Sequence, residues 1–130
     1  MVASDGSALA TSGVLRSGNP HPRSFGTFPR VLGKYAREEK LFDLAEAIRK
    51  ITALPASALG IKDRGLLQVG NFADVVIFDP DKVIDRAIWT APHQYPEGIR
   101  FVLVNGEVVI DESEFTGKLA GRVLRAPFGR

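Results

Sequence analysis

The chain has 130 residues, of which 45% are apolar and 25% charged, and these are ordinary proportions for one soluble domain. Its 17 basic and 15 acidic residues leave a net charge of +2, so composition gives no dominant attraction to nucleic acid or anionic lipid. The chain has no cysteine, which excludes disulfide bonds, thiolate metal ligands and a cysteine nucleophile. No apolar run approaches the roughly 18 residues of a membrane span, so we expect no membrane association.

The first 23 residues are rich in glycine, serine, alanine and threonine and show no sustained apolar period. This composition predicts a long loop. Met1 is followed by neither a basic segment nor an apolar core, which is unlike a secretory signal, and we expect a cytoplasmic protein. Residues 7–36 contain arginines but no acidic residue, as organelle transit peptides do, yet Pro20 and Pro22 disfavour the amphipathic helix of such a peptide.

Residues 26–60 are predicted to be helical. Thr27 is expected to cap a first helix with Pro29 close to its first turn, because a hydroxyl accepts from free N–H groups and proline is tolerated there. Apolar side chains then follow at three- and four-residue spacing, at Phe28, Val31, Leu32 and Tyr35. Gly33 weakens this helix by about 1 kcal/mol relative to alanine.

A second helix is predicted from Asp43, since Glu46 three residues later makes a start similar to a capping box. Its apolar face comprises Leu44, Ala47, Ile48 and Ile51. Pro55 ends this helix, because proline lacks the N–H that a helix interior needs. A short third helix is expected over residues 56–59, closed by Gly60 in the left-handed region.

Residues 64–111 are predicted to form β-structure. Two segments, 66–69 and 74–78, are rich in β-branched or large apolar residues and are separated by a Gly-Asn turn, so we expect adjacent strands. Over residues 101–110, two apolar runs flank an Asn-Gly pair. This pair is preferred in a type I′ turn, which predicts a hairpin.

Residues 79–98, between the two β segments, are interrupted by three prolines and hold Trp89, His93 and Tyr95. We expect them to form a surface excursion. Residues 117–130 carry four basic side chains and no acidic one, and they are predicted to be a solvated tail.

The candidate chemical groups lie beside turn signals. Asp5, in Ser-Asp-Gly after a short apolar stub, could be a carboxylate at the C-terminal end of a strand, where barrel and open-sheet enzymes place their chemistry. From spacing alone, the favoured interpretation is a turn or capping aspartate, since Ser-Asp-Gly is common turn chemistry. His21 and Arg23 flank a proline; Arg23 could hold a substrate carboxylate with two parallel hydrogen bonds, or be a solvated loop arginine.

A zinc site cannot readily be built from this chain alone. A catalytic zinc needs about three protein ligands and an open position for water. Two histidines, His21 and His93, are present, 72 positions apart, and there is no cysteine. No glycine-rich phosphate loop and no nucleophile-elbow serine occurs either, so nucleotide-phosphate enzymes and serine hydrolases of that kind are excluded.

Six segments form a known pattern: residues 4–6 (SDG), 21–33 (HPRSFGTFPRVLG), 44–52 (LAEAIRKIT), 65–79 (GLLQVGNFADVVIFD), 92–98 (PHQYPEG) and 104–107 (VNGE). Together they resemble the C-terminal part of the N-acyl-D-amino-acid deacylases, the D-aminoacylases of the metal-dependent amidohydrolase superfamily. The Gly-x-x-Ala-Asp motif before an apolar strand recurs across the superfamily, whereas the segment that begins His-Pro-Arg points to the deacylase branch. The resemblance covers nearly the whole chain.

The resemblance implies roles for three residues. Asp5 matches the carboxylate that acts as general base toward the metal-bound water and then as acid toward the leaving amine. Arg23 matches the arginine that anchors the α-carboxylate of the N-acyl-D-amino acid substrate, a small molecule, and His21 matches a neighbouring position with a supporting role. In the full-length family the implied cofactor is zinc.

Length separates this chain from a complete deacylase, because a (β/α)₈ barrel alone takes about 250 residues. The family's zinc ligands, a cysteine and histidines on earlier strands, have no counterpart here. The expected fold class is therefore α+β, with residues 1–60 from the end of the barrel, 61–116 from a small β domain with the hairpin 101–110, and 117–130 as the basic tail. We expect the isolated chain to bind no zinc and to be inactive.

Two other functions remain open from the sequence. The chain could be a non-catalytic α+β interaction module derived from such an enzyme, forming a homo-oligomer through the surface that would pack against a barrel. Nucleic-acid binding through the basic tail is the weaker alternative, because Phe128 is the one aromatic residue among its arginines.

Overall fold

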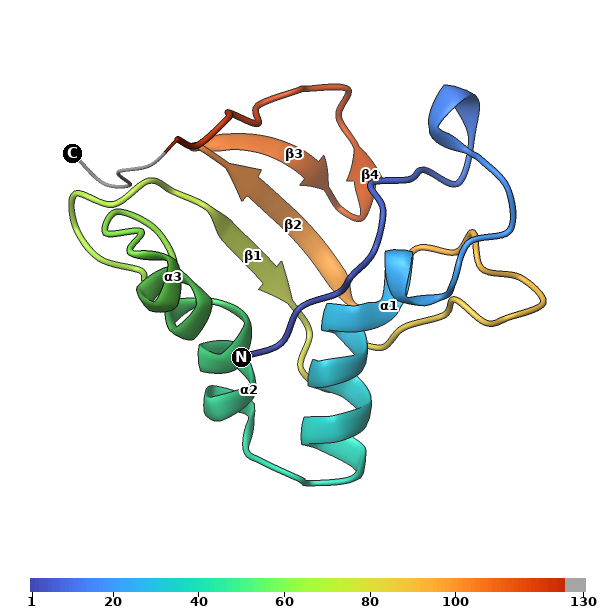
Figure 1. Ribbon diagram of the computed structural model, residues 1–130, viewed down its shortest axis with the longest axis horizontal. Helices are drawn as coiled ribbons and strands as arrows, with labels where there is room; N and C mark the ends of the chain where they lie inside the picture. The colour runs from blue at the N-terminus through green and yellow to red at the C-terminus, as the bar shows by residue number, and fades with distance from the viewer. Residues whose placement is uncertain (126–130) are drawn as a thin grey trace. The chain divides into compact units, whose positions relative to one another are not determined.

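In the computed structural model, which describes residues 1–125, the chain folds into helices and one antiparallel sheet (Figure 1). Its contacts divide it into two units. The helical unit comprises Val2–Ala47 and Pro80–Gly98, and the sheet unit comprises Ile48–Asp79 and the residues from Ile99 onward, together with Met1. The predicted α+β class is confirmed.

Helix α1 spans Arg23–Arg30 in the helical unit and begins earlier than the sequence predicts. Thr27 is not its cap: the Thr27 hydroxyl lies inside the helix and donates to the Arg23 carbonyl at 3.0 Å. Pro22, with φ −50° and ψ −24°, already has helical backbone angles. Since proline is favoured at a helix start, the helix begins at the His-Pro-Arg segment instead.

Helix α1 continues into a wider π-helical segment, η2, which spans Val31–Glu38. The change of hydrogen bonding follows Pro29, which has no N–H to offer the preceding turn. Gly33 in η2 approaches the chain at Val83 so closely that a Cβ atom on Gly33 would lie 2.3 Å from the Val83 carbonyl oxygen. The glycine that weakens the helix is therefore required by a main-chain contact.

Helix α2, Leu44–Ile51, starts as predicted. The N–H of Glu46 donates to Oδ1 of Asp43 at 2.7 Å, so the carboxylate satisfies one of the free donors of the first turn. The helix dipole is stabilised at both ends, by Glu46 in the first turn and by Arg49 and Lys50 in the last turn.

Helix α3, Ala53–Leu59, ends at Gly60 in the left-handed region, as predicted, with φ 72°. It begins two positions before Pro55 rather than after it. This is possible because the first N–H groups of a helix have no intrahelical partner, so a proline there costs no hydrogen bond. Thr52, with φ −128° and ψ −87°, separates α3 from α2.

The core of the helical unit is small and apolar, and it comprises Val31, Leu32, Ala36, Ala47, Val83 and Ala87. Val83 and Ala87 belong to the segment 80–98, which was expected to be a surface excursion. The expectation holds only in part, because Val83 is fully buried. Arg37 ties the same segment to η2 by donating to the Pro80 and Val83 carbonyls at 3.0 and 2.8 Å.

The sheet unit holds four strands in the order β1-β2-β3-β4, each antiparallel to its neighbour: β1 Val75–Phe78, β2 Ile99–Val104, β3 Glu107–Asp111 and β4 Glu114–Phe115. Asn105 and Gly106 join β2 to β3 with φ values of 52° and 85°. Both residues thus adopt the positive φ of a type I′ turn, and the predicted hairpin is present.

The predicted strand at 66–69 is wrong. Leu67 and Val69 are 85% and 102% exposed, and β1 pairs with β2, for example Val76 with Val102, instead of with this segment. A strand forms only where another strand satisfies its backbone groups, and residues 66–69 find no such partner within residues 1–125.

A polar cluster ties the loop before β1 to the hairpin. Arg64, whose side chain is 12% exposed, donates to the Asp74 carboxylate and to Oδ1 of Asn105 at 2.5 Å. The Asn105 N–H donates to Oδ1 of Asp74 at 2.8 Å, and the guanidinium lies 4.2 Å from the centre of the Phe72 ring. Asn105 therefore serves both the turn and this cluster.

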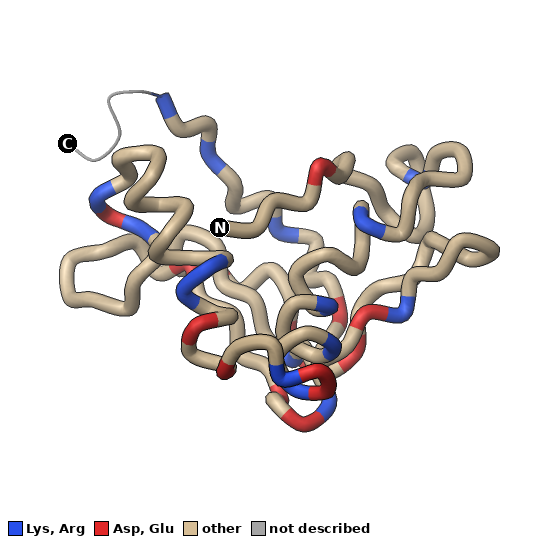
Figure 2. Tube along the Cα trace, turned by 60° about the horizontal axis from the view of Figure 1, so that its bottom comes forward, with Lys and Arg blue, Asp and Glu red and all other residues tan. Residues whose placement is uncertain are grey.

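Basic and acidic residues occur close to one another along the chain trace (Figure 2). In η2 and the loop after it, Lys34 pairs with Glu39 at 3.5 Å. In the sheet unit, Lys118 pairs with Glu107 at 2.6 Å, so the predicted solvated tail contacts the hairpin. The last part of that tail, residues 126–130, lies outside the described residues. Within residues 1–125, no helix has the length and apolar character needed to cross a membrane.

Candidate functional site

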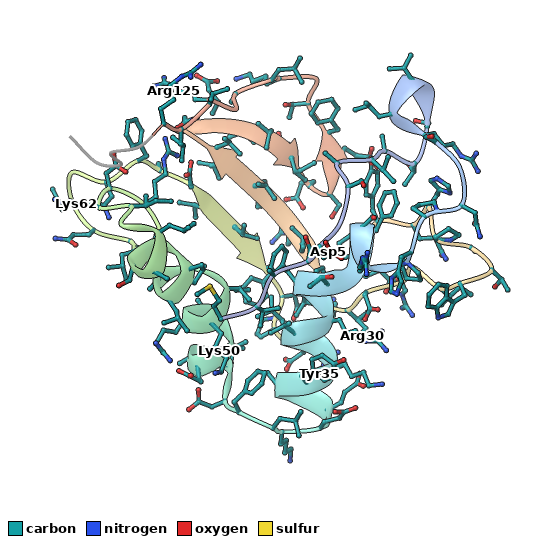
Figure 3. The ribbon with its side chains drawn as sticks, in the orientation of Figure 1. Asp5, Arg30, Tyr35, Lys50, Lys62 and Arg125 are labelled. Atoms are coloured by element: carbon teal, nitrogen blue, oxygen red, sulfur yellow. The ribbon has the colours of Figure 1, made fainter. Side chains whose placement is uncertain are left out.

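Two predicted site residues, Asp5 and Arg23, lie side by side in the helical unit. Nη2 of Arg23 is 2.8 Å from Oδ2 of Asp5. Arg23 is the first residue of α1, and Figure 3 shows Asp5 beside that end of the helix. The Arg23 and Asp5 side chains are 44% and 85% exposed, so solvent and small molecules have access to both.

The backbone around Asp5 fixes this approach. Asp5 itself has φ 48°, a left-handed conformation that is uncommon outside glycine but that aspartate tolerates. The N–H of Gly6 donates to Oγ of Ser4 at 3.2 Å. Gly6 comes so close to α1 that a Cβ atom there would lie 2.9 Å from Cα of Ser24. The turn is thus held against the first turn of α1, which places Asp5 over Arg23.

The expected strand before Asp5 is not seen. Residues 1–10 have no regular secondary structure, and the first element is the 3₁₀ helix η1, Gly13–Leu15. An apolar stub of three residues cannot form a strand without a partner, and none pairs with it in the described chain. Asp5 is therefore positioned by its turn and by α1.

His21 supports the start of α1 through its ring. Its Nδ1 accepts the backbone N–H of Arg23 at 3.0 Å, and the ring meets Trp89 edge-on with 4.3 Å between ring centres. Trp89 is 67% exposed. Since one ring nitrogen is used by the Arg23 backbone, His21 holds the residue that carries the guanidinium.

Further rings pack behind the first turn of α1. Phe25 contacts His93 and Tyr95 with centre distances of 5.7 and 6.0 Å, and the Tyr95 hydroxyl accepts the Thr11 N–H at 3.4 Å. Nε2 of His93 is buried and has no hydrogen-bond partner among residues 1–125. These rings from residues 80–98 anchor the helix that carries Arg23.

One residue of this region carried no signal in the sequence. Asp85, whose side chain is 7% exposed, pairs with Nη1 of Arg30 at 2.5 Å. Hydrogen bonding to Asp85 raises the pKa of Arg30 above its ordinary value, with a smaller contribution from Tyr35. In the sequence, Asp85 lies between Ile84 and Arg86, a pattern typical of a surface residue. A glycine inside a helix, Gly26, is the one local feature consistent with the close approach of Asp85 to α1.

The site brings together an exposed guanidinium and an exposed carboxylate. Within residues 1–125, no group of three or more His, Cys, Asp or Glu side chains could hold a metal ion. Nδ1 of His21 already accepts the Arg23 N–H, and the His93 ring packs against Phe25. Among the described residues, the donors therefore do not make up the ligand set of a zinc site.

Comparison with known proteins identifies the family of the chain. Residues 15–110 match the sequence profile of the amidohydrolase family. The chain is 49% identical over 116 residues to D-aminoacylase of Alcaligenes xylosoxydans xylosoxydans, which covers 89% of this chain and 24% of that protein. N-acyl-D-glutamate deacylase of the same organism is 48% identical over 90% of this chain and 24% of its own length. The chain thus spans about a quarter of these curated relatives.

Solved structures give the same result. A crystal structure of D-aminoacylase superposes with a TM-score of 0.79 at 48% identity, over 81% of this chain and 22% of that one. The N-acyl-D-glutamate deacylase of Bordetella bronchiseptica, complexed with zinc and a phosphonate inhibitor, superposes with a TM-score of 0.69 at 54% identity, over 70% of this chain and 19% of that one. D-aminoacylase is likewise described with a binuclear metal centre. Profile, sequence and fold agree that the chain belongs to the amidohydrolase family.

Proposed function

We propose that this chain is the C-terminal part of a metal-dependent amidohydrolase that cleaves N-acyl-D-amino acids into a carboxylate and a D-amino acid. Arg23 binds the α-carboxylate of the substrate, and Asp5 transfers the proton. The observation that carries this proposal is the 2.8 Å ion pair between Arg23 and Asp5, in a chain 49% identical to a D-aminoacylase.

Arg23 has the chemistry that a carboxylate anchor needs. A guanidinium presents parallel N–H donors that match both oxygens of a carboxylate. One of its terminal nitrogens engages Asp5, and the side chain remains 44% exposed. A substrate carboxylate therefore competes with Asp5 for the guanidinium, and its binding releases Asp5 for proton transfer.

Asp5 then acts on the amide bond beside the anchored carboxylate. One carboxylate oxygen takes the proton of the attacking water as the water oxygen bonds to the acyl carbon. The same oxygen returns the proton to the amine nitrogen as the C–N bond breaks. A positioned acid or base of this kind contributes roughly 10²- to 10⁴-fold to the rate.

The half-exposed sheet supports the idea that the chain belongs to a larger protein. Val76 and Ile77 are neighbours in β1 and are 51% and 48% exposed. Successive strand residues point to opposite faces, so apolar side chains are accessible on both faces of this strand. Isolated proteins seldom leave a sheet uncovered on both sides, and a longer enzyme would cover it.

A chimera tests the proposed function. The matched C-terminal quarter of the Alcaligenes D-aminoacylase is replaced by this chain, so that the metal ligands come from the rest of the enzyme. We expect hydrolysis of N-acetyl-D-methionine. Asp5→Asn lowers kcat by roughly 10²- to 10⁴-fold, while Arg23→Lys mainly raises KM, because it removes binding common to ground and transition states.

The controls are Glu114→Gln and Arg16→Lys, which change exposed residues of the same charges that take no part in the ion pair. Both leave the kinetics unchanged. A chimera that holds zinc but gives no hydrolysis, or one that keeps full activity with Asp5→Asn, contradicts the proposal. The isolated chain is expected to retain no stoichiometric zinc and to give no turnover, which metal analysis and the same assay check.

A second candidate is an interaction module that associates with its own copy. Its support is the exposure of apolar residues in the sheet unit, where Leu66 and Leu67 are 59% and 85% exposed, since exposed apolar patches tend to be covered by association. Native mass spectrometry of the purified chain separates the two candidates. A defined oligomer favours the module, and a monomer favours the enzyme part.

A further inference from the structure

The inference concerns Asp85, a charged group that the proposed chemistry does not use. Its side chain is 7% exposed and belongs to the helical unit. Removing a carboxylate from water is costly unless a partner compensates it, and Arg30 does so at 2.5 Å. This ion pair, in which Asp85 is nearly buried and Arg30 is 41% exposed, therefore joins α1 to the segment 80–98 within this unit.

Asp85, from the segment 80–98, contacts α1 at Gly26 and Arg30. Arg23, Gly26 and Arg30 follow at a spacing of three and four residues, so they form one stripe along the helix. The carboxylate of Asp85 binds Arg30 at one end of the stripe. Its Cβ packs in the middle, where a Cβ atom on Gly26 would lie 2.9 Å away. Arg23, beside Asp5, occupies the other end.

This arrangement fixes both the rotation and the depth of α1. A helix turns by about 100° and rises 1.5 Å per residue, so a slip of one residue would aim Arg23 away from Asp5. Asp85 fits against α1 in one position, where Gly26 leaves room for its Cβ and Arg30 pairs with its carboxylate. Figure 3 shows Asp5 beside the upper part of this helix and Arg30 further down it.

We propose that Asp85 is a positioning residue that holds the stripe of α1 so that Arg23 faces the substrate carboxylate. The inference rests on the proposed role of Arg23 as carboxylate anchor. Asp85 does not touch the substrate and acts through the register of the helix.

The test uses Asp85→Asn in the chimera described above, because asparagine keeps the shape and removes the charge. We expect KM for N-acetyl-D-methionine to rise about tenfold while kcat changes less than about twofold, since a misplaced anchor loses uniform binding. A merely structural role would lower the amount of active enzyme, so kcat would fall at unchanged KM, and that result overturns the proposal.

The matched control is Glu97→Gln. Glu97 pairs with Arg86 at 2.5 Å in the same segment, but both side chains are at least half exposed and neither lies on α1. This variant leaves KM unchanged. Where Asp85→Asn gives no soluble enzyme, Arg30→Lys decides: it keeps the cation but not the guanidinium geometry, and a KM equal to that of the parent overturns the proposal.

A double-mutant cycle shows whether Asp85 acts through Arg23. In an Arg23→Lys background the anchor is already lost, so Asp85→Asn adds less than about twofold to KM. If the increases in KM caused by Asp85→Asn and Arg23→Lys multiply in the double variant, the proposal is overturned. An Arg23→Lys variant with unchanged KM refutes the proposed function itself, and the positioning role fails with it.

Discussion

Gly33→Ala tests whether the contact between η2 and Val83 holds the helical unit together. In a free helix this substitution is stabilising by about 1 kcal/mol. In the structure the new Cβ would lie 2.3 Å from the Val83 carbonyl oxygen and 2.7 Å from Cδ1 of Ile84. Overpacking typically costs about 1–3 kcal/mol. We expect a cost of about 3 kcal/mol here, because the backbone carbonyl of Val83 cannot rotate away.

The net expectation for Gly33→Ala is therefore a loss of about 2 kcal/mol, or about 8 °C in melting temperature for a domain of this size. The assay is thermal unfolding followed by tryptophan fluorescence, since the single tryptophan, Trp89, lies in the helical unit. Gly121→Ala is the control, because no atom of the described residues lies within 4 Å of the added Cβ. A Gly33→Ala variant that melts at or above the wild-type temperature refutes the reasoning.

Three further substitutions test other contacts. Asp43→Ala removes the acceptor of the Glu46 N–H and should cost about 1 kcal/mol in urea unfolding, whereas Asp43→Asn retains most of it. Asn105→Ala places alanine at φ 52° and removes side-chain hydrogen bonds, so we expect a loss of about 2 kcal/mol in thermal unfolding. The pKa of Glu112 lies below its usual range because Arg100 hydrogen-bonds to it. Its contribution to stability is therefore present above about pH 4.3 and lost as the pH falls through the lowered value, so melting temperatures of wild type and Glu112→Gln should differ at pH 6 and converge near pH 3.

Features fixed by local chemistry were predictable from the sequence. The start of α2 follows from Asp43 and Glu46, and the β2-β3 hairpin follows from Asn105 and Gly106, because each needs only neighbours in the chain. The left-handed end of α3 at Gly60 belongs to the same group. In each case the residue type sets the backbone angles or supplies the hydrogen bond directly.

Features that depend on distant partners were missed. Residues 66–69 have strand composition, but β1 pairs with β2 and leaves them unpaired. Thr27 is the predicted start of α1, but the helix begins at Arg23, after Pro22, where it also packs against Gly6. A propensity states what a segment tolerates, and only tertiary contacts decide whether the partner is there.

The candidate site shows the same division. Asp5 and Arg23 were selected by resemblance to a family, since turn chemistry alone explains Ser-Asp-Gly equally well. Their 2.8 Å contact is a property of the fold. Asp85 had no sequence signal, because burial of a carboxylate is visible only once its partner Arg30 is placed beside it.

In space, the main chain of Val83 is approached closely by Gly33 and by Gly98. These contacts constrain how the segment 80–98 can evolve. A Cβ on Gly33 would meet the Val83 carbonyl oxygen at 2.3 Å, and a Cβ on Gly98 would meet the Val83 nitrogen at 2.5 Å. The base of the segment 80–98 is therefore held by close main-chain contacts, whereas at its tip Ile88 bridges Ala91 and Trp89 meets the His21 ring. Length variation should be concentrated at that tip, where doubling a loop costs only about 0.6 kcal/mol, and an epitope or a fluorescent label inserted at Thr90 should leave the base intact.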